Sequence, residues 1–124
     1  MKNLLIIPML FMCSMVIGQS KKIIGKPIKI ENFEVAQNDF PKMMTWYEAK
    51  KACYALGSRW RLPTKNELIL LYINEDEIGG FVSSYYWSSA EYDSSYACYQ
   101  SFDFGRQGNY DKNYKCYVRA VRAF

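Results

Sequence analysis

The nine residues Trp60-Arg61-Leu62-Pro63-Thr64-Lys65-Asn66-Glu67-Leu68 decide how this chain folds. Pro63 disfavours helical geometry at the residue before it, so the preceding segment ends there. Thr64 and Glu67 have the spacing of a capping box, in which each side chain accepts a hydrogen bond from the other residue's backbone amide. The sequence therefore predicts a helix that begins after Thr64. The run that follows, 68–73, is apolar on almost every side, and we expect it to be buried.

A second capping box lies earlier in the chain, at Thr45 and Glu48. Residues with helical spacing follow it and form one apolar face: Trp46, Ala49, Cys53 and Leu56. Gly57 suits the left-handed geometry in which many helices end. The sequence thus predicts two helices joined by a short connection, with the tryptophans among the core residues.

Outside the helices, side chains alternate with the period of two that is typical of strands. A first strand is expected near residues 32–37. Further strands are predicted at 85–89, 96–104 and 116–124, with an acidic surface segment at 74–77 and a polar hairpin loop at 105–115. Strand, helix, helix and at least three antiparallel strands make an α+β domain, in which we expect the first strand to return beside the last.

The first eighteen residues have the features of a secretory signal peptide. Lys2 supplies a positive start, an apolar run from 4 to 17 follows, and Gly18 is a small residue suited to cleavage. The run is shorter than the ~20 residues that span a membrane comfortably. An uncleaved anchor is the less favoured alternative, and Met12 before Cys13 disfavours a lipoprotein.

The expected organisation is therefore a signal peptide at 1–18, a leader at 19–31 and one folded domain at 32–124. This predicts a product that is secreted or held at the cell envelope or surface, with no membrane span after signal removal.

The composition removes several classes of function. The 124 residues contain no histidine, which excludes histidine-based general bases, Ser-His-Asp triads and histidine metal sites. The formal net charge of +4 is too small for a nucleic-acid-binding stripe. Carboxylates at 75–77, Glu91 and Asp93 are calcium ligands in principle, but a solvated acidic loop is favoured. We predict no enzymatic activity, no cofactor, no metal and no nucleic-acid partner.

Three cysteines remain after signal removal: Cys53, Cys98 and Cys116. An odd number allows at most one internal disulfide and one spare thiol. All three pairings are open at this point, and so is the alternative that the cysteines are small buried apolar side chains.

All eleven tyrosines lie between Tyr47 and Tyr117. The stretch 92–114 mixes tyrosine with Ser, Asn and Asp, as antibody paratopes do, because tyrosine offers a large contact area at low entropic cost. A polar strand surface with ordinary loops is the alternative. The candidate ligand-binding residues are Tyr92, Tyr96, Tyr99, Arg106, Asn109, Tyr110, Asp111, Asn113 and Tyr114.

Five segments together resemble a known family: FEVAQ at 33–37, WRLPT at 60–64, GGF at 79–81, YWSS at 86–89 and VRAVR at 118–122. They are similar to the C-terminal domain of the Legionella collagen-like adhesin (Lcl), a family also found as secreted paralogues in Bacteroidetes. The resemblance covers residues 32–124. It implies a C-type-lectin-like fold, with two helices packed on a small antiparallel sheet.

The resemblance also implies a disulfide, because in such folds a cysteine on the first helix commonly bridges to the last strand. Cys53 and Cys116 stand at those two places, and Cys98 with Cys116 is the runner-up pair. Arg119 and Arg122 are expected to make structural contacts, with Glu67 as one partner.

The function implied is a secreted or cell-surface binding module for an extracellular glycan, glycosaminoglycan or protein. The adhesin relatives bind sulfated polysaccharides, so Arg106, Lys112 and Lys115 are candidates for sulfate contacts. One alternative is a display protein diversified by a retroelement, whose variable region has a similar composition. The least favoured alternative is an enzyme of the sulfatase-modifying type that uses Cys98.

Overall fold

The computed structural model describes residues 18–57 and 59–124, so most of the predicted signal peptide lies outside the described residues. The described elements are β1 Ile28–Ile30, β2 Phe33–Val35, α2 Trp46–Ala55, α3 Lys65–Ile73, α4 Glu75–Ile78, β3 Tyr85–Glu91, β4 Tyr96–Ser101, β5 Gln107–Asp111 and β6 Val121–Ala123. Residues 18–24 are also helical. The chain is an α+β domain, as expected.

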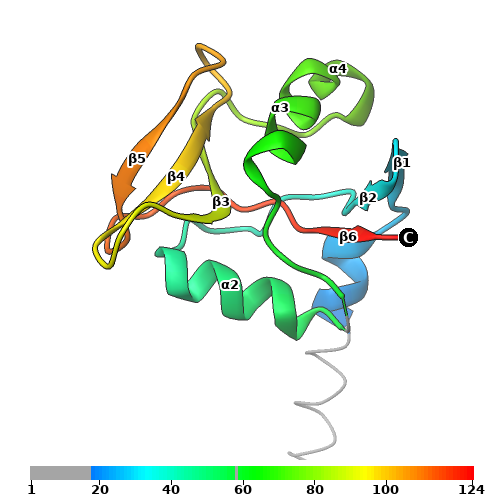
Figure 1. The fold of residues 1–124 in the computed structure, drawn as a ribbon. Helices are drawn as coiled ribbons and strands as arrows, with labels where there is room; N and C mark the ends of the chain where they lie inside the picture. The colour runs from blue at the N-terminus through cyan, green and yellow to red at the C-terminus, as the bar shows by residue number, and fades with distance from the viewer. Residues whose placement is uncertain (1–17, 58) are drawn as a thin grey trace, which may run out of the picture.

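Two three-stranded antiparallel sheets lie at opposite ends of the molecule, with strand orders β1-β2-β6 and β3-β4-β5 (Figure 1). α2 and the α3–α4 pair lie on opposite sides of the segments that connect the sheets (Figure 1). β2 pairs with β6 through Val35 and Val121, so the expected return of the first strand beside the last is confirmed.

The stretch expected to be a leader contains regular structure. Residues 18–24 are helical, and β1 pairs with β2 in the order Ile28–Val35 to Ile30–Phe33. Ile23 and Ile24 are partly buried against one core cluster, while Ile28 and Ile30 pack against the other. Apolar burial therefore draws this lysine-rich segment into the fold.

Three predicted segments differ from the structure. The acidic segment forms the one-turn helix α4, because Ile78 is buried and holds it against the core. The predicted hairpin loop contains β5, which pairs along its whole length with β4. The predicted last strand is shortened to β6, and its first part makes only single bridges, Met44 to Cys116 and Tyr86 to Tyr117.

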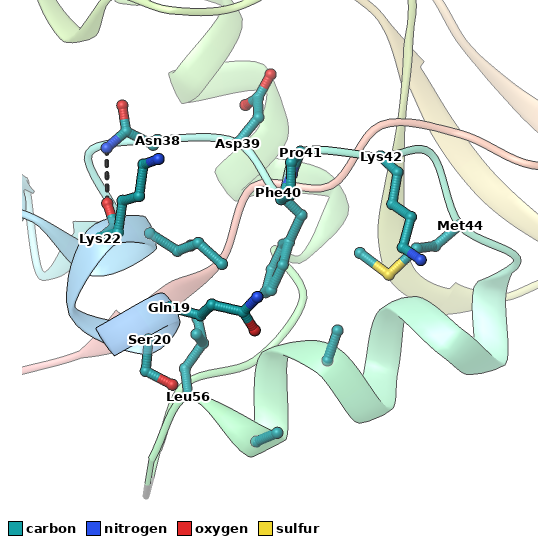
Figure 2. A pocket seen from close by; sticks show the side chains of 13 residues that line it. Gln19, Ser20, Lys22, Asn38, Asp39, Phe40, Pro41, Lys42, Met44 and Leu56 are labelled. Atoms are coloured by element: carbon teal, nitrogen blue, oxygen red, sulfur yellow. Dashed lines mark hydrogen bonds between the residues drawn. The ribbon is translucent and has the colours of Figure 1, made fainter. Parts of the chain in front are cut away.

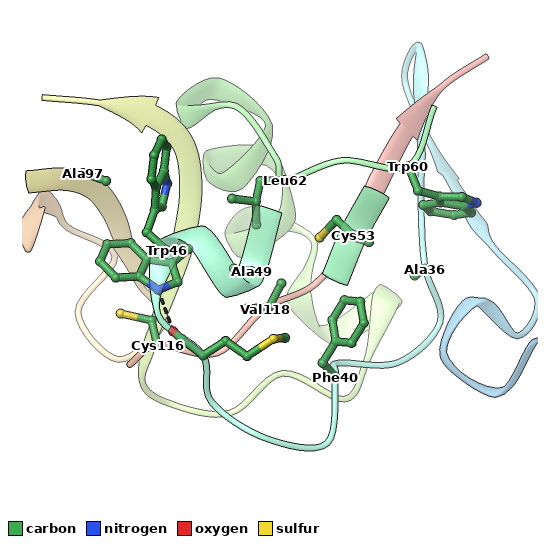
Figure 3. Packing of buried hydrophobic residues seen from close by; sticks show 13 residues of the cluster. Ala36, Phe40, Trp46, Ala49, Cys53, Trp60, Leu62, Ala97, Cys116 and Val118 are labelled. Carbon is green, nitrogen blue, oxygen red and sulfur yellow. Dashed lines mark hydrogen bonds between the residues drawn. The ribbon is translucent and has the colours of Figure 1, made fainter. Parts of the chain in front are cut away.

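The core has two parts. Around α2, a cluster joins Trp46, Ala49 and Cys53 to Leu62 and Val118 (Figure 3). A second cluster lies under α3 and includes Phe33, Leu68, Leu71, Tyr86 and Phe102. All three tryptophans are at most 2% exposed, which confirms their predicted place in the core.

Both predicted capping boxes are present, at the start of α2 and of α3. α3 is less buried than its apolar sequence predicts. Leu68 and Leu71 are fully buried, but Ile69 and Ile73 are 39% and 69% exposed. Only one face of α3 packs on the β3–β4 strands, so the expectation of burial on every side was wrong.

Glu67 completes the second box and also pairs with an arginine. Its carboxylate accepts hydrogen bonds from the Thr64 amide at 2.9 Å and from both terminal nitrogens of Arg61, at 2.6 and 2.9 Å. Burial alone raises the pKa of Glu67, but the bonds from Arg61 and Thr64 outweigh it and leave the pKa below its ordinary value.

We expect Glu67→Gln to lower the free energy of unfolding by about 1 kcal/mol at neutral pH. Because the folded pKa is depressed, this stability is present above the unfolded pKa near ~4.3 and is lost as pH falls through the folded value. Urea unfolding of both proteins across acidic pH checks this. A deficit that stays constant down to the most acidic measurement would contradict it.

The predicted disulfide between Cys53 and Cys116 is absent, and all three cysteines in the described ranges are free and buried. Cys116 bridges to Met44 just before α2, whereas Cys53 lies seven residues along the helix from Trp46. Seven residues place Cys53 ~10 Å along the axis of α2 from Trp46, the end of the helix near which Cys116 lies. A disulfide tolerates a Cα separation of only ~7 Å. Figure 3 shows the two side chains well apart.

Burial raises the pKa of Cys53 and of Cys116 to about 12, so both remain unreactive thiols. We expect native protein to resist alkylation at these two positions at mildly alkaline pH. After unfolding without reductant, Cys53, Cys98 and Cys116 should all react, as peptide mass spectrometry can show. Recovery of a linked Cys53–Cys116 peptide would contradict this.

Candidate ligand-binding face

Four tyrosines gather on one face of the β3-β4-β5 sheet, and we call Tyr85, Tyr99, Tyr110 and Tyr114 the tyrosine face. Tyr85 and Tyr99 stack with ring centroids 4.1 Å apart and an interplanar angle of 17°. Tyr110 meets both rings edge-on, at 5.5 and 5.7 Å. The Tyr114 ring lies 4.9 Å from that of Tyr110 and is 55% exposed.

The strand register explains this convergence. Tyr99 is opposite Gly108 on β5 and Trp87 on β3, and side chains on one face recur at every second residue. A Cβ atom on Gly108 would lie 2.8 Å from the Tyr99 hydroxyl, so glycine leaves the space that the tyrosine ring occupies. Trp87 is fully buried, and its ring centroid lies 6.2 Å from that of Tyr110. The Tyr110 ring is therefore supported by Trp87 from the core side.

The face presents neutral hydroxyl groups and one cation. Burial, followed by the neighbouring Tyr85, raises the pKa of Tyr99, and burial also raises the pKa of Tyr110. Both hydroxyls are therefore protonated at neutral pH and can donate and accept hydrogen bonds. Arg106 is exposed, acts on Tyr99 electrostatically, and places its guanidinium carbon 5.8 Å from the exposed Phe104 ring.

The structure brings together only some of the predicted ligand-binding residues. Tyr99, Tyr110 and Tyr114 converge, with Arg106 beside them, and Tyr85 joins them although the sequence analysis did not select it. Its membership depends on the pairing of β3 with β4, which cannot be read from a single strand.

The other predicted residues lie elsewhere. Tyr92 and Tyr96 are exposed at the β3–β4 turn, where Asp93 accepts hydrogen bonds from the amides of Ser95 and Tyr96 at 2.8 Å. On β5, Asn109 alternates with Tyr110 and so lies on the opposite face. Asp111 accepts a hydrogen bond from the Asn113 amide at 2.8 Å and stabilises the next turn.

Comparison with protein families identifies the fold family. The sequence profile described as the Lcl C-terminal domain matches residues 26–122. The chain belongs to this family. A search of curated proteins found no significant match.

Two solved structures have the same C-type-lectin-like fold as this Lcl C-terminal domain. The crystal structure of botrocetin matches with a TM-score of 0.61 at 10% identity, over 81% of this chain and 98% of botrocetin. Botrocetin in complex with a von Willebrand factor A1 domain mutant matches with a TM-score of 0.59, at the same identity and coverage. At 10% identity the likeness shows the fold alone.

Lys112 is not available for ligand contacts in this Lcl C-terminal domain, contrary to its selection as a sulfate contact. Its side chain is 3% exposed, and its ammonium group donates to a Glu91 carboxylate oxygen at 2.8 Å and to the Ser94 carbonyl at 3.2 Å. It also lies 4.7 Å from the centroid of the Trp46 ring. Lys112 therefore connects the β3–β4 turn, through Glu91 and Ser94, to Trp46 at the start of α2.

The expected pairing of Arg119 or Arg122 with Glu67 was also wrong. Arg119 pairs with Asp39 at 2.6 Å, and Arg122 pairs with Glu34 on the adjacent strand. Arg61, only six residues from Glu67, takes that carboxylate instead.

Away from the tyrosine face, an apolar groove lies between helical residues 18–24, α2 and the loop before it (Figure 2). Its volume is about 620 Å³, and its apolar lining includes Ile23, Phe40, Met44, Ala52 and Leu56. The sequence analysis missed this groove because its walls combine residues 19–23, 38–44 and 52–56, which only the folded chain brings together.

Within the described residues, no group of three or more Cys, Asp or Glu side chains is placed to hold a metal ion. Likewise, none of the helices in that part of the chain is both long enough and apolar enough to cross a membrane.

Proposed function

We propose that this domain is a secreted or cell-surface, non-enzymatic binding module, and that it holds an extracellular glycan, glycosaminoglycan or protein on the tyrosine face. The observation that carries the proposal is the preassembled cluster of four tyrosines, whose neighbouring ring centroids lie 4.1 to 5.7 Å apart: Tyr85, Tyr99, Tyr110 and Tyr114.

Tyrosine rings combine an apolar body with a polar tip, so they suit ligands that are themselves mixed in polarity. A sugar ring offers C–H groups to the aromatic rings and hydroxyls to the tyrosine hydroxyls. Because the rings already pack on one another and on Trp87, binding costs little additional conformational entropy. Arg106 adds a planar fork for a carboxylate or sulfate group.

A protein is the alternative to a glycan as the ligand in this proposal. Botrocetin, which has the same fold, has been solved in complex with a von Willebrand factor A1 domain. Tyrosine and arginine are also the side chains that contribute most often to the energetic centre of protein interfaces. Both ligand classes therefore predict the same residues on this chain.

An array of extracellular glycans and matrix proteins, probed with the purified mature chain, tests the proposal. For a retained ligand, we expect Tyr114→Ala and Arg106→Ala each to weaken binding at least about tenfold, which is about 1.4 kcal/mol. Tyr54→Ala is the matched control, because Tyr54 is 78% exposed on α2, which lies outside this sheet. Equal binding by all three variants, or no ligand on the array, would count against the proposal.

Secretion remains part of this proposal. Mass spectrometry of the N-terminus of the mature chain should place the first residue at Gln19. A chain that retains residues 1–18 in the cell would contradict it.

A diversified display protein is the second candidate. Six of the nine predicted ligand-binding residues are exposed, so substitutions there leave the core unchanged: Tyr92, Tyr96, Arg106, Asn109, Asn113 and Tyr114. Sequencing the surrounding genome tests this candidate. It requires a reverse transcriptase gene and a near-copy of the coding segment that differs mainly at adenines, and it fails without them.

A further inference from the structure

The outward side of α2 carries tyrosine and lysine side chains and no carboxylate. Four exposed residues at helix positions i, i+3, i+4 and i+7 share that side: Tyr47, Lys50, Lys51 and Tyr54. They lie opposite Ala49 and Cys53, which are fully buried. Tyr47 is 55% exposed and Tyr54 is 78% exposed. A helix side that is both aromatic and basic is typical of a surface that meets a membrane interface.

Further lysines surround this side of α2. Hydrogen bonds from Thr45 lower the pKa of Glu48, which is in the first turn of α2. The charges of Lys115 and Lys42 lower it further, so both ammonium groups are close to that turn. Lys22 lines the groove that residues 18–24 form with α2 (Figure 2). We call the following residues the basic α2 surface: Tyr47, Tyr54, Lys22, Lys42, Lys50, Lys51 and Lys115.

The five lysines of this surface are all exposed, and the protein does not neutralise them. Among the residues that the structure describes, none of these lysines takes part in an ion pair. The nearby carboxylates are engaged elsewhere: Glu48 caps α2, Glu91 pairs with the buried Lys112, and Asp39 pairs with Arg119. The acidic helix α4 lies on the other side of the molecule from α2 (Figure 1). The charges of the domain are therefore separated, and its basic side suits an anionic partner.

The chain enters the domain beside this surface. Gln19 and Ser20 lie next to Leu56, at the end of α2, where they line the same groove (Figure 2). The apolar run 4–17 precedes them directly in the sequence. A signal peptide brings its precursor to a membrane, so the basic α2 surface is the side of the domain nearest to that membrane. This placement rests on the proposed secretion, whereas the exposed lysines and tyrosines do not.

We propose that the basic α2 surface docks on a membrane that contains anionic phospholipids. Tyrosine suits the level of the lipid headgroups, where its ring meets the acyl boundary and its hydroxyl stays in water. Tyr47 and Tyr54 reach that level, and the lysines extend along the surface to the lipid phosphates. Each lysine near such a surface strengthens binding about fivefold, so the attachment is reversible and is weakened by salt. The contact uses none of the residues of the tyrosine face.

Flotation of the mature chain with lipid vesicles tests the role of charge. The chain should float with vesicles of equal parts phosphatidylglycerol and phosphatidylcholine but not with phosphatidylcholine alone, and added salt should release it. Lys51→Gln should weaken this binding about fivefold. Lys65→Gln is the matched control, because it removes the same charge from an exposed position on α3, on the other side of the molecule. The control should have little effect.

A second pair of variants tests the role of the tyrosines. Tyr54→Ala should weaken vesicle binding. Phe104→Ala should not, although Phe104 is 71% exposed, because it lies beside Gly105, which packs against Tyr72 of α3.

Equal losses within either pair, or no binding to the anionic vesicles at low salt, would overturn the proposal. So would capture of the chain by soluble heparin through Lys51 without vesicle binding, because the partner would then be a soluble polyanion. None of these outcomes bears on the tyrosine face, which Tyr114→Ala tests separately.

Discussion

Arg119→Met is expected to lower the free energy of unfolding by about 3–5 kcal/mol, because it leaves a buried carboxylate without its cation. Arg119 is 1% exposed, and its Nε donates to Asp39 Oδ1 at 2.6 Å. Its terminal nitrogens donate to the carbonyls of Ala36 and Gly79, at 3.2 and 3.1 Å. Through these bonds, one side chain connects the loop after β2, the glycine turn before β3, and the segment that leads to β6.

Tyr86 and Phe81 complete this network. The Tyr86 hydroxyl donates to Asp39 Oδ2 at 2.5 Å and accepts a hydrogen bond from the Val82 amide at 2.9 Å. The guanidinium carbon of Arg119 lies 4.1 Å from the Phe81 ring centroid. Removing the arginine therefore also removes packing area from the second core cluster.

The pH dependence identifies the cause of the loss. Burial raises the pKa of Asp39 above its ordinary value, although Arg119 and Tyr86 oppose that rise. Without Arg119 the folded pKa rises further, so the folded variant takes up a proton at a pH where the unfolded chain, with a pKa near ~3.9, has none. The variant's deficit should be greatest at neutral pH and shrink as pH falls toward ~4.

Urea unfolding of the native chain and of Arg119→Met at several pH values checks this prediction. The double variant Asp39→Asn with Arg119→Met is the control, because it removes the unpaired charge, and it should recover part of the loss. A deficit at neutral pH below about 1 kcal/mol would mean that the pair behaves like an exposed salt bridge.

Trp87→Ala has a comparably large expected effect, about 3–5 kcal/mol, because it removes a fully buried ring from between α2 and the β3-β4-β5 sheet. The indole nitrogen of Trp87 donates to the Met44 carbonyl at 2.8 Å. The Trp46 indole makes the reciprocal connection, to the Ser88 carbonyl, also at 2.8 Å. Together these bonds join the start of α2 to β3.

Trp87→Phe separates packing from hydrogen bonding. It keeps an aromatic ring but loses the donor, and the Met44 carbonyl keeps its bond from the Cys116 amide at 3.0 Å. We therefore expect less than half the loss seen for Trp87→Ala, measured by thermal or urea unfolding. Equal losses for the two variants would show that the indole hydrogen bond, and not ring volume, dominates at this position.

The capping boxes were predicted correctly because they depend on neighbours in the chain. Thr64 and Glu67 are three residues apart, so their capping box can be read directly from the sequence. The partner of Arg119 cannot, because Asp39 is 80 positions away in a segment that resembles an ordinary turn. Lys112 was taken for a surface cation for the same reason, since its partner Glu91 lies 21 positions earlier.

Part of the ligand-binding face was predicted because its tyrosine-rich composition lies in one stretch of the sequence. The rest was not predicted, because the geometry of the face depends on how separate strands pair. Tyr99, Tyr110 and Tyr114 were selected from a tyrosine-rich stretch, and they do converge. Which of their neighbours share that face depends on strand register, and a shift of one residue moves every side chain to the other side. That dependence explains why Tyr85 was missed.

The most direct test of the central claim is a titration of isotope-labelled protein with a ligand retained on the array, followed by amide and tyrosine-ring NMR signals. The account predicts that the largest shifts fall at Tyr85, Tyr99, Arg106, Tyr110 and Tyr114, with little change on the outer surface of α2. Shifts that instead cluster on helical residues 18–24 and Phe40, around the apolar groove, would contradict it.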